Sequence, residues 1–185
     1  MAEHAVGRAG RPTGSAVVLG AGAVGTLVAL VLRDSGLRDV TLVDADEGRR
    51  QQAAALTAFP AVDAVPRFAP GAGVTLFECS GSAGALNAAL RAVPVRTHVV
   101  LVEVHSEATP TDLDALLHKE ITLTGSSSHS RADFVRAVGR LARSPETFRP
   151  LLGRRAGLDD APAALTRLAH THDAGKLLVG GQEDS

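Results

Sequence analysis

Three glycines near the start of the chain have the spacing of a phosphate-binding turn. Residues 16–25 read AVVLGAGAVG, so an apolar run leads directly into Gly20-x-Gly22-x-x-Gly25. In such a turn the first glycine permits a tight bend and the second lets the backbone approach a pyrophosphate. The third lets the following helix pack closely on the sheet, and the N–H groups at the start of that helix can bind phosphate oxygens.

An acidic residue follows at the distance that this kind of site requires. Asp44 ends the apolar run TLVD, about 20 residues beyond the last glycine. A carboxylate at this point can accept hydrogen bonds from the hydroxyls of an adenosine ribose, and it repels a 2′-phosphate. The order of strand, glycines, helix, second strand and acid therefore predicts a site for NAD rather than NADP. The alternative interpretation is a glycine turn that serves the fold alone.

The elements that must position these residues can be read from the hydrophobic pattern. Short apolar runs alternate with helical patterns, which is typical of a parallel sheet flanked by helices. We predict an α/β fold, a Rossmann-type doubly wound parallel sheet of about six strands with helices on both faces. Strands are expected at 15–20, 40–44, 74–79, 98–104 and 120–125, with a weaker candidate at 62–66 and a closing strand at 176–179. Helices are expected at 23–36, 47–58, 82–92, 111–118, 131–143 and 159–170.

Length and composition narrow the domain organisation and the class of partner. Residues 1–14 are expected to form a flexible N-terminal segment, residues 15–185 a single domain, and residues 60–73 a loop within it. The formal net charge is −1, and the chain has five Phe but no Trp or Tyr. A nucleic-acid partner would call for a basic surface and aromatic platforms, so none is expected.

Cysteine and histidine usage bears on metal binding and on the cellular compartment. With Cys79 as the only cysteine, neither an internal disulfide nor a thiolate zinc site is expected. The pair His170 and His172 has no third ligand nearby, so no metal is predicted there either. The first residues lack the apolar centre of a signal peptide, and the run AVGTLVALVL is too short to span a bilayer. We expect a cytoplasmic protein with no membrane partner.

From about residue 15 to residue 179 the chain resembles the cofactor-binding half of the medium-chain dehydrogenase/reductase family, which includes zinc alcohol and polyol dehydrogenases. The resemblance rests on VVLGAGAVG, TLVDADEGRR, LFECSGSAGALNAAL, HVVLVEV, LLHKEITLTGSSSHSRADF and LDDAPAALTRL…GKLLV. It implies that the glycine turn holds the pyrophosphate, that Asp44 binds the adenosine ribose and that Arg49 lies beside the adenine. The positions that it assigns to cofactor binding are Gly20, Gly22, Ala23, Val24, Gly25, Asp44, Arg49, Ser80 and Gly81. It also implies a homodimer formed through the edge strand at 120–128.

Several departures from the family pattern bear on activity. The family's separate catalytic domain, with its zinc ligands and proton relay, has no counterpart among these motifs, so we expect a truncated member. The helix between the third and fourth strands is also expected to be missing. A Gly-Gly turn before the fifth strand is replaced by Arg96-Thr97. Glu103 stands where the family has a glycine close to the nicotinamide.

Glu103 and His105 are the candidate catalytic residues. If the strand extends that far, their side chains share one face, and a carboxylate beside an imidazole can transfer protons near neutral pH. Glu78, Cys79 and Ser80 at the neighbouring strand end could add to such a site, with Cys79 as a nucleophile or as a small buried hydrophobe. The alternative is that polar residues at this edge simply face solvent.

Three functional readings follow. The first is an NAD-dependent oxidoreductase whose catalytic groups come from Glu103 and His105 or from a partner chain, acting on a small molecule. The second is a non-redox enzyme that uses the same two residues for proton transfer, elimination, cyclisation or isomerisation. The third is a non-catalytic dimeric binding or accessory module for another enzyme. The glycine turn favours the first reading, whereas Glu103 and the expected truncation favour the others.

Overall fold

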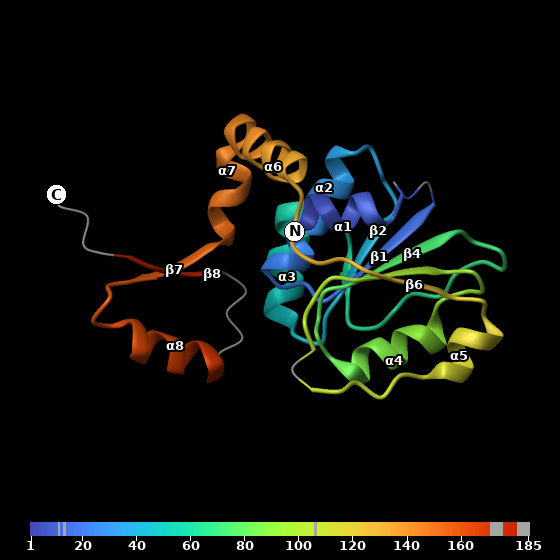
Figure 1. Ribbon diagram of the computed structural model, residues 1–185. Coiled ribbons are helices and arrows are strands. Elements are labelled where there is room, and N and C mark those ends of the chain that lie inside the picture. The colour runs from blue at the N-terminus through green and yellow to red at the C-terminus, as the bar shows by residue number, and fades with distance from the viewer. Residues whose placement is uncertain (11, 13, 106, 171–175, 181–185) are drawn as a thin grey trace.

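A six-stranded parallel sheet forms the centre of the computed structural model (Figure 1). The structure describes residues 1–10, 12, 14–105, 107–170 and 176–180, without the side chains of 168–170. The strands run in the order β3-β2-β1-β4-β5-β6, which confirms the predicted doubly wound sheet, with its change of direction between β1 and β4. Their bounds are β1 (Ser15–Leu19), β2 (Val40–Val43), β3 (Ala61–Val62), β4 (Val74–Glu78), β5 (His98–Leu101) and β6 (Thr122–Gly125).

Helices cover both faces of this sheet (Figure 1). One face carries α1 (Ala2–Arg8), α2 (Ala23–Asp34) and α3 (Glu47–Thr57), and the other carries α4 (Ala83–Ala92) and α5 (Leu113–His118). Side chains alternate between the two cores, as strand geometry requires. Val18 and Phe77 belong to the core under α1 and α2, whereas Val17 and Leu76 belong to the core under α4.

The connections also match the local sequence signals. Asp46 caps α3 by accepting a hydrogen bond from the N–H of Arg49 at 2.8 Å, and Gly36 follows α2 with a φ of +92°, as expected of a residue just past a helix end. Residues 63–73, all of which are described, contain no helix. The loop expected at 60–73 is therefore confirmed for 63–73, whereas the weaker strand candidate at 62–66 is the shorter β3, which begins within the expected loop. Among the described residues no helix has both the length and the apolar character needed to cross a bilayer.

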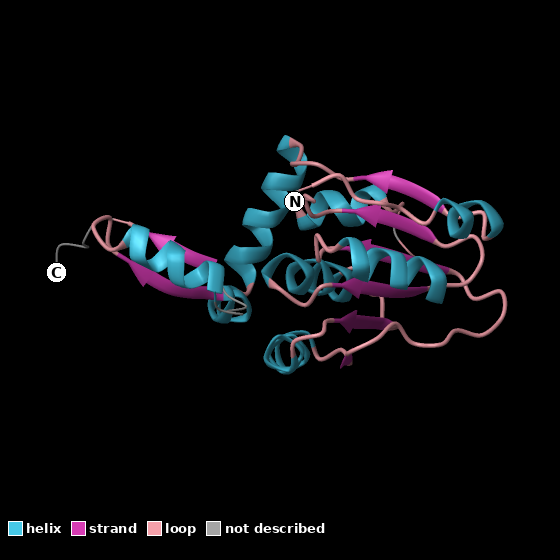
Figure 2. Ribbon diagram, turned by 90° about the horizontal axis from the view of Figure 1, so that it is seen from below, coloured by secondary structure: helices cyan, strands magenta, loops and turns pink. Residues whose placement is uncertain are grey.

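The C-terminal segment contains a second, two-stranded sheet that the sequence did not predict. After α6 (Arg131–Arg143), α7 (Pro145–Phe148) and a 3-10 helix η1 (Arg149–Leu151), the strand β7 (Leu152–Ala156) pairs in parallel with β8 (Lys176–Val179) across α8 (Ala161–His170). Both views show this small sheet projecting from the side of the main body (Figures 1 and 2). The strand β7 was not predicted, because its sequence LGRRA has no apolar alternation. Residues 176–179 form a strand as expected, but it closes this second sheet.

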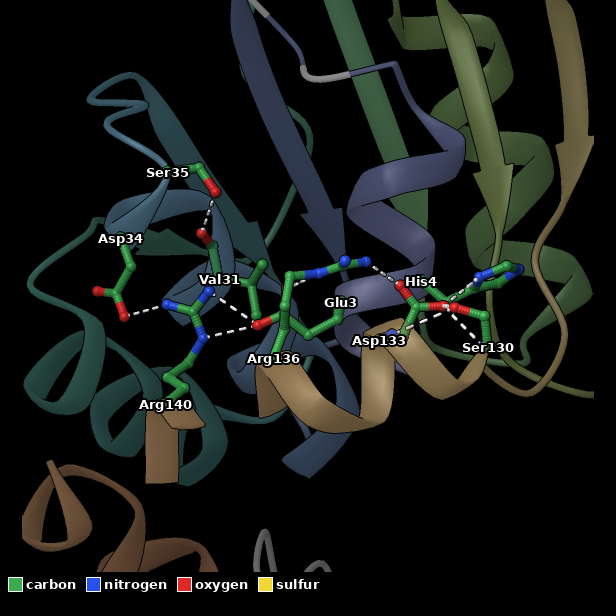
Figure 3. A network of polar contacts seen from close by, with 9 residues as sticks. All are labelled: Glu3, His4, Val31, Asp34, Ser35, Ser130, Asp133, Arg136 and Arg140. Carbon is green, nitrogen blue, oxygen red and sulfur yellow. Dashed lines mark hydrogen bonds and ion pairs between the residues drawn. The ribbon is translucent and has the colours of Figure 1, made fainter. Parts of the chain in front are cut away.

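The N-terminal segment is a helix rather than the expected flexible stretch. Ala5 and Val6 of α1 are 0% and 5% exposed in the core shared with α2. Figure 3 shows that polar side chains fasten α1 to α6. Arg140 donates to Glu3 at 2.8 Å and also binds Asp34 at the end of α2. The sequence did not reveal this anchoring, because the buried apolar residues of α1 are small and its polar partners lie more than 100 residues away.

Asp133 is the centre of the other half of this network. Its carboxylate accepts from the hydroxyl and the N–H of Ser130, both at 2.7 Å, and lies 2.9 Å from Nδ1 of His4 (Figure 3). Ser130 in turn accepts from the N–H of Asp133, which completes a capping box at the start of α6. These hydrogen bonds from Ser130, with those from His4 and the charge of Arg136, outweigh burial and hold the pKa of Asp133 well below its usual value.

We expect the Asp133→Asn variant to lose about 1–2 kcal/mol of unfolding free energy at neutral pH, because the cap and the contact with His4 are weakened. Since the folded-state pKa of Asp133 is lowered, its stabilisation is fully present above the unfolded-state value of about 3.9 and declines as pH falls below it. Urea unfolding of both proteins at several pH values should therefore show a difference that shrinks in acid. A constant difference would contradict this assignment.

Candidate functional site

A cleft of about 810 Å³ opens at the carboxyl ends of the central strands. It spans the point where the strand order reverses, between β1 and β4, which is where doubly wound sheets bind ligands. The β1–α2 turn, the end of β2, the β4–α4 turn and the segment after β5 line it, and Lys176 and Leu177 of β8 border it as well. The predicted cofactor residues that line this cleft are Gly20, Gly22, Ala23, Val24, Asp44, Arg49 and Ser80.

The glycine turn has the geometry that the sequence predicted. Gly20 adopts a φ of +99°, and a Cβ there would lie 2.8 Å from the carbonyl of Cys79. A Cβ on Gly25 would lie 1.8 Å from the carbonyl oxygen of Gly20, so only glycine fits between helix and turn. Gly22 has open space on its Cβ side and directly precedes α2. The N-terminus of α2 therefore faces the cleft with room for an anion.

Asp44 connects this turn to the end of β2. Its carboxylate accepts hydrogen bonds from the N–H of Ala21 at 2.8 Å and of Asp46 at 2.9 Å. Arg49 donates to both carboxylate oxygens, from Nε at 3.1 Å and from Nη2 at 2.8 Å. Burial alone would raise the pKa of Asp44, but these hydrogen bonds and the Arg49 charge outweigh it, so the pKa lies below its usual value. The carboxylate is thus held charged at the rim of the cleft.

The β4–α4 turn is organised by Glu78, which is fully buried. Its Oε1 accepts from the N–H and the hydroxyl of Ser80 at 2.8 and 2.5 Å, and from the N–H of Gly81 at 2.9 Å. Gly81 has a φ of +63°, and a Cβ there would lie 3.1 Å from the carbonyl oxygen of Val104. Sequence reasoning named Glu78 only as a possible addition to a catalytic group. The sequence signal for its role in holding the turn is an acidic residue at the end of a buried strand, directly before a Ser-Gly turn.

The expected pairing of Glu103 with His105 does not form. β5 ends at Leu101 rather than at residue 104, because the N–H groups of Val102 and Glu103 both donate to the carbonyl of Glu78, at 2.9 and 3.2 Å. Residues 103 and 105 therefore lie beyond the strand, and their side chains need not share one face. Nε2 of His105 lies 3.3 Å from Oε2 of Glu78 instead. Glu103 alone of the expected pair lines the cleft, and an acid–base role for either residue stays a prediction.

Comparison with known proteins now identifies the family. Residues 23–143 match the family described as zinc-binding dehydrogenase. The chain belongs to this family. It is 30% identical over 173 residues to the 2-dehydro-3-deoxy-L-galactonate 5-dehydrogenase of Pseudoalteromonas atlantica, covering 89% of this chain and 50% of that protein. It is 28% identical over 183 residues to sorbitol dehydrogenase 1 of Saccharomyces cerevisiae, covering 90% of this chain and 51% of that protein.

Solved structures of other proteins have the same fold. L-Idonate 5-dehydrogenase of Escherichia coli superposes with a TM-score of 0.80 at 21% identity, covering 96% of this chain and 53% of that one. S. aureus TarJ in complex with NADPH gives a TM-score of 0.82 at 19% identity, covering 98% and 61%. The chain thus spans about half the length of the curated relatives it matches. The family match and the half-length coverage confirm the resemblance to the cofactor-binding half of the dehydrogenases. They lend no support to the non-redox and accessory readings.

The zinc of the family name has no site in the part of this chain that the structure describes. No group of three or more His, Cys, Asp or Glu side chains there could hold a metal ion. His170 and His172, for which no metal was predicted, lie outside the residues with described side chains.

Cys79 has the character of a buried hydrophobe rather than of a nucleophile. Its side chain is buried at the base of the cleft. Burial, together with the neighbouring charges of Glu78 and Glu103, raises the pKa of the thiol well above its ordinary value. A thiolate, the reactive form, is disfavoured there. Of the two interpretations of this cysteine, the structure favours the structural one.

Proposed function

We propose that this chain is the NAD(H)-binding part of an oxidoreductase of the zinc-binding dehydrogenase family. The observation that carries the proposal is the cleft at the strand switch, with the open Gly22 turn on one side and the charged Asp44 on the other. The pyrophosphate would lie at the N-terminus of α2, and the adenosine ribose at Asp44. The cofactor accepts or supplies a hydride, while Ser80 lines the far side of the cleft.

Asp44 supports NAD over NADP. A 2′-phosphate on the adenosine ribose would come close to this carboxylate, and like charges at that distance repel. The names of the relatives, which include dehydrogenases of sorbitol and of sugar acids, support a small-molecule substrate. A partner chain that supplies further catalytic groups is compatible with this proposal.

Calorimetric titration of the whole chain with NADH and NADPH tests the proposal. We expect saturable binding of NADH with a dissociation constant below the millimolar range, and binding of NADPH about tenfold weaker or more. The Glu103→Gln variant, which removes a charge after β5 on the opposite side of the cleft from Asp44, should retain the preference. No saturable binding of either cofactor would refute the proposal.

We further propose a homodimer through residues 120–128, supported by the exposed edge of the sheet. β6 is an edge strand of the main sheet, and Leu123 on it is 42% exposed. The N–H of Thr122 donates to Thr97 and that of Ser126 to Leu101, so the N–H of Leu123 points away from β5. The neighbouring α6 exposes a further apolar group, Phe134, Val135, Val138 and Leu141. Strand edges and apolar patches of this kind are sites of association.

We expect wild-type protein to sediment as a dimer and the Leu123→Pro variant as a monomer. Proline removes the outward N–H but leaves the hydrogen bonds between β5 and β6 intact. The Leu123→Thr variant keeps the N–H and should remain dimeric at micromolar concentration. Sedimentation velocity measures the mass, and circular dichroism verifies that each variant is folded. A monomeric wild type would refute the dimer.

A further inference from the structure

We propose that the carboxylate of Glu103 makes this cleft favour the oxidised, positively charged form of the cofactor over the neutral reduced form. The inference rests on the proposed NAD(H) binding and names the redox state that the site selects. Hydride addition removes the positive charge of the nicotinamide ring, and hydride loss restores it. A carboxylate beside that ring therefore interacts differently with the two forms.

The fold places Glu103 on the nicotinamide side of the cleft. A dinucleotide lies across the strand switch, with one mononucleotide on each half of the sheet. Asp44 ends β2, so the adenosine half belongs over β1–β3 and the nicotinamide half over β4–β6. Glu103 follows the end of β5 and lines the same cleft as Gly22 and Asp44.

The position of Glu103 is set by its backbone and by the adjacent turn. Its N–H donates to the carbonyl of Glu78 at 3.2 Å. A Cβ added to Gly81 would lie 3.3 Å from Cγ of Glu103, so the stem of this side chain packs against the β4–α4 turn. Glu103 is therefore held against this turn and is only partly exposed to solvent.

The charge of Glu103 is also poorly compensated, in contrast to that of Asp44. Asp44 is paired with Arg49, whereas within the described residues Glu103 receives one hydrogen bond, from the N–H of Val104 at 3.3 Å, and no ion pair. The other charged side chains that line the cleft are Asp63 and Lys176. The influence of Glu103 reaches the base of the cleft, because it contributes, after burial and Glu78, to the raised pKa of Cys79.

Elementary electrostatics gives the expected size of the effect. Opposite unit charges near a protein surface attract strongly enough to change a binding constant by about tenfold. The neutral dihydronicotinamide of NADH has no net charge to attract. A tenfold change in the ratio of the two dissociation constants lowers the reduction potential of the bound couple by about 30 mV.

The test compares dissociation constants for NAD⁺ and NADH in wild type, Glu103→Gln and Asp63→Asn. We expect Glu103→Gln to weaken NAD⁺ binding about tenfold while NADH changes by less than about twofold. Asp63→Asn makes the same charge change on the adenosine half, and should leave the ratio of the two constants unaltered.

Equal changes for both cofactor forms in Glu103→Gln would overturn the inference and indicate a steric role for the side chain. A change confined to NADH would also overturn it. If the wild type binds neither NAD⁺ nor NADH, the proposed NAD(H) binding itself is wrong. If the wild type binds both and Glu103→Gln leaves the ratio of the two dissociation constants unaltered, only the inference about Glu103 is wrong.

Discussion

We expect the Gly25→Ala variant to lose about 3 kcal/mol or more of its unfolding free energy and to bind no cofactor. The added methyl carbon would lie 1.8 Å from the carbonyl oxygen of Gly20 and 3.1 Å from Cγ1 of Val18. The nearest obstacle is backbone, so the first turn of α2 must shift away from the sheet, and the phosphate-binding turn shifts with it. Denaturant unfolding followed by circular dichroism measures the stability, and NADH titration measures the binding.

Gly22→Ala is the matched control for Gly25→Ala. A methyl group on Gly22 meets no atom within 4 Å and points into open space, so stability should stay within about 0.5 kcal/mol of wild type. We expect NADH affinity to fall about tenfold or more, because the methyl occupies the approach to the pyrophosphate. If Gly22→Ala and Gly25→Ala had the same stability and the same affinity for NADH, the turn would have no role in cofactor binding and our interpretation would be wrong.

The second large effect is expected at Asp44. In the Asp44→Ala variant we expect about 100-fold weaker NADH binding, because two hydrogen bonds from ribose hydroxyls to a charged acceptor are lost. Arg49, freed from its partner, can then bind a 2′-phosphate, so the preference between NADH and NADPH should reverse. Calorimetry with both cofactors measures the reversal. Weaker binding of both by the same factor would contradict a specificity role.

Asp44→Ala should also reduce stability by about 2 kcal/mol at neutral pH, since the N–H groups of Ala21 and Asp46 lose their acceptor. The pKa of Asp44 is lowered in the folded state. Its contribution is therefore complete above the unfolded-state value of about 3.9 and declines as pH falls below that value. Unfolding of both proteins as a function of pH checks this sign.

The parts of the fold that were predictable are those with local signals. The glycine turn, the acid at the end of β2 and the alternating apolar runs depend on neighbours in sequence, and the six strands of the main sheet follow from them. The features that the sequence did not reveal depend on distant contacts. β5 stops early because two N–H groups share the carbonyl of Glu78, and His105 consequently meets Glu78 rather than Glu103.

The same reasoning accounts for the two termini. The apolar side chains that α1 buries are small, and the helix depends on Arg140 and Asp133 for its anchoring. The strand β7 exposes nearly all of its residues and is recognised only by its pairing with β8. Neither α1 nor β7 has a periodic pattern of apolar residues by which the sequence alone could reveal it. Each is held by a partner that lies elsewhere in the chain.

The hydrogen-bonding capacity of Asp44 has a consequence for how a dinucleotide enters. Its two oxygens already accept four hydrogen bonds, from Ala21, from Asp46 and twice from Arg49, and a carboxylate has about four such positions. In the proposed complex the backbone donors stay in place, so the ribose would replace the guanidinium. Association at this end of the cleft is thus an exchange of one set of bonds for another. Such an exchange favours discrimination between cofactors and rapid release of the bound cofactor over tight binding.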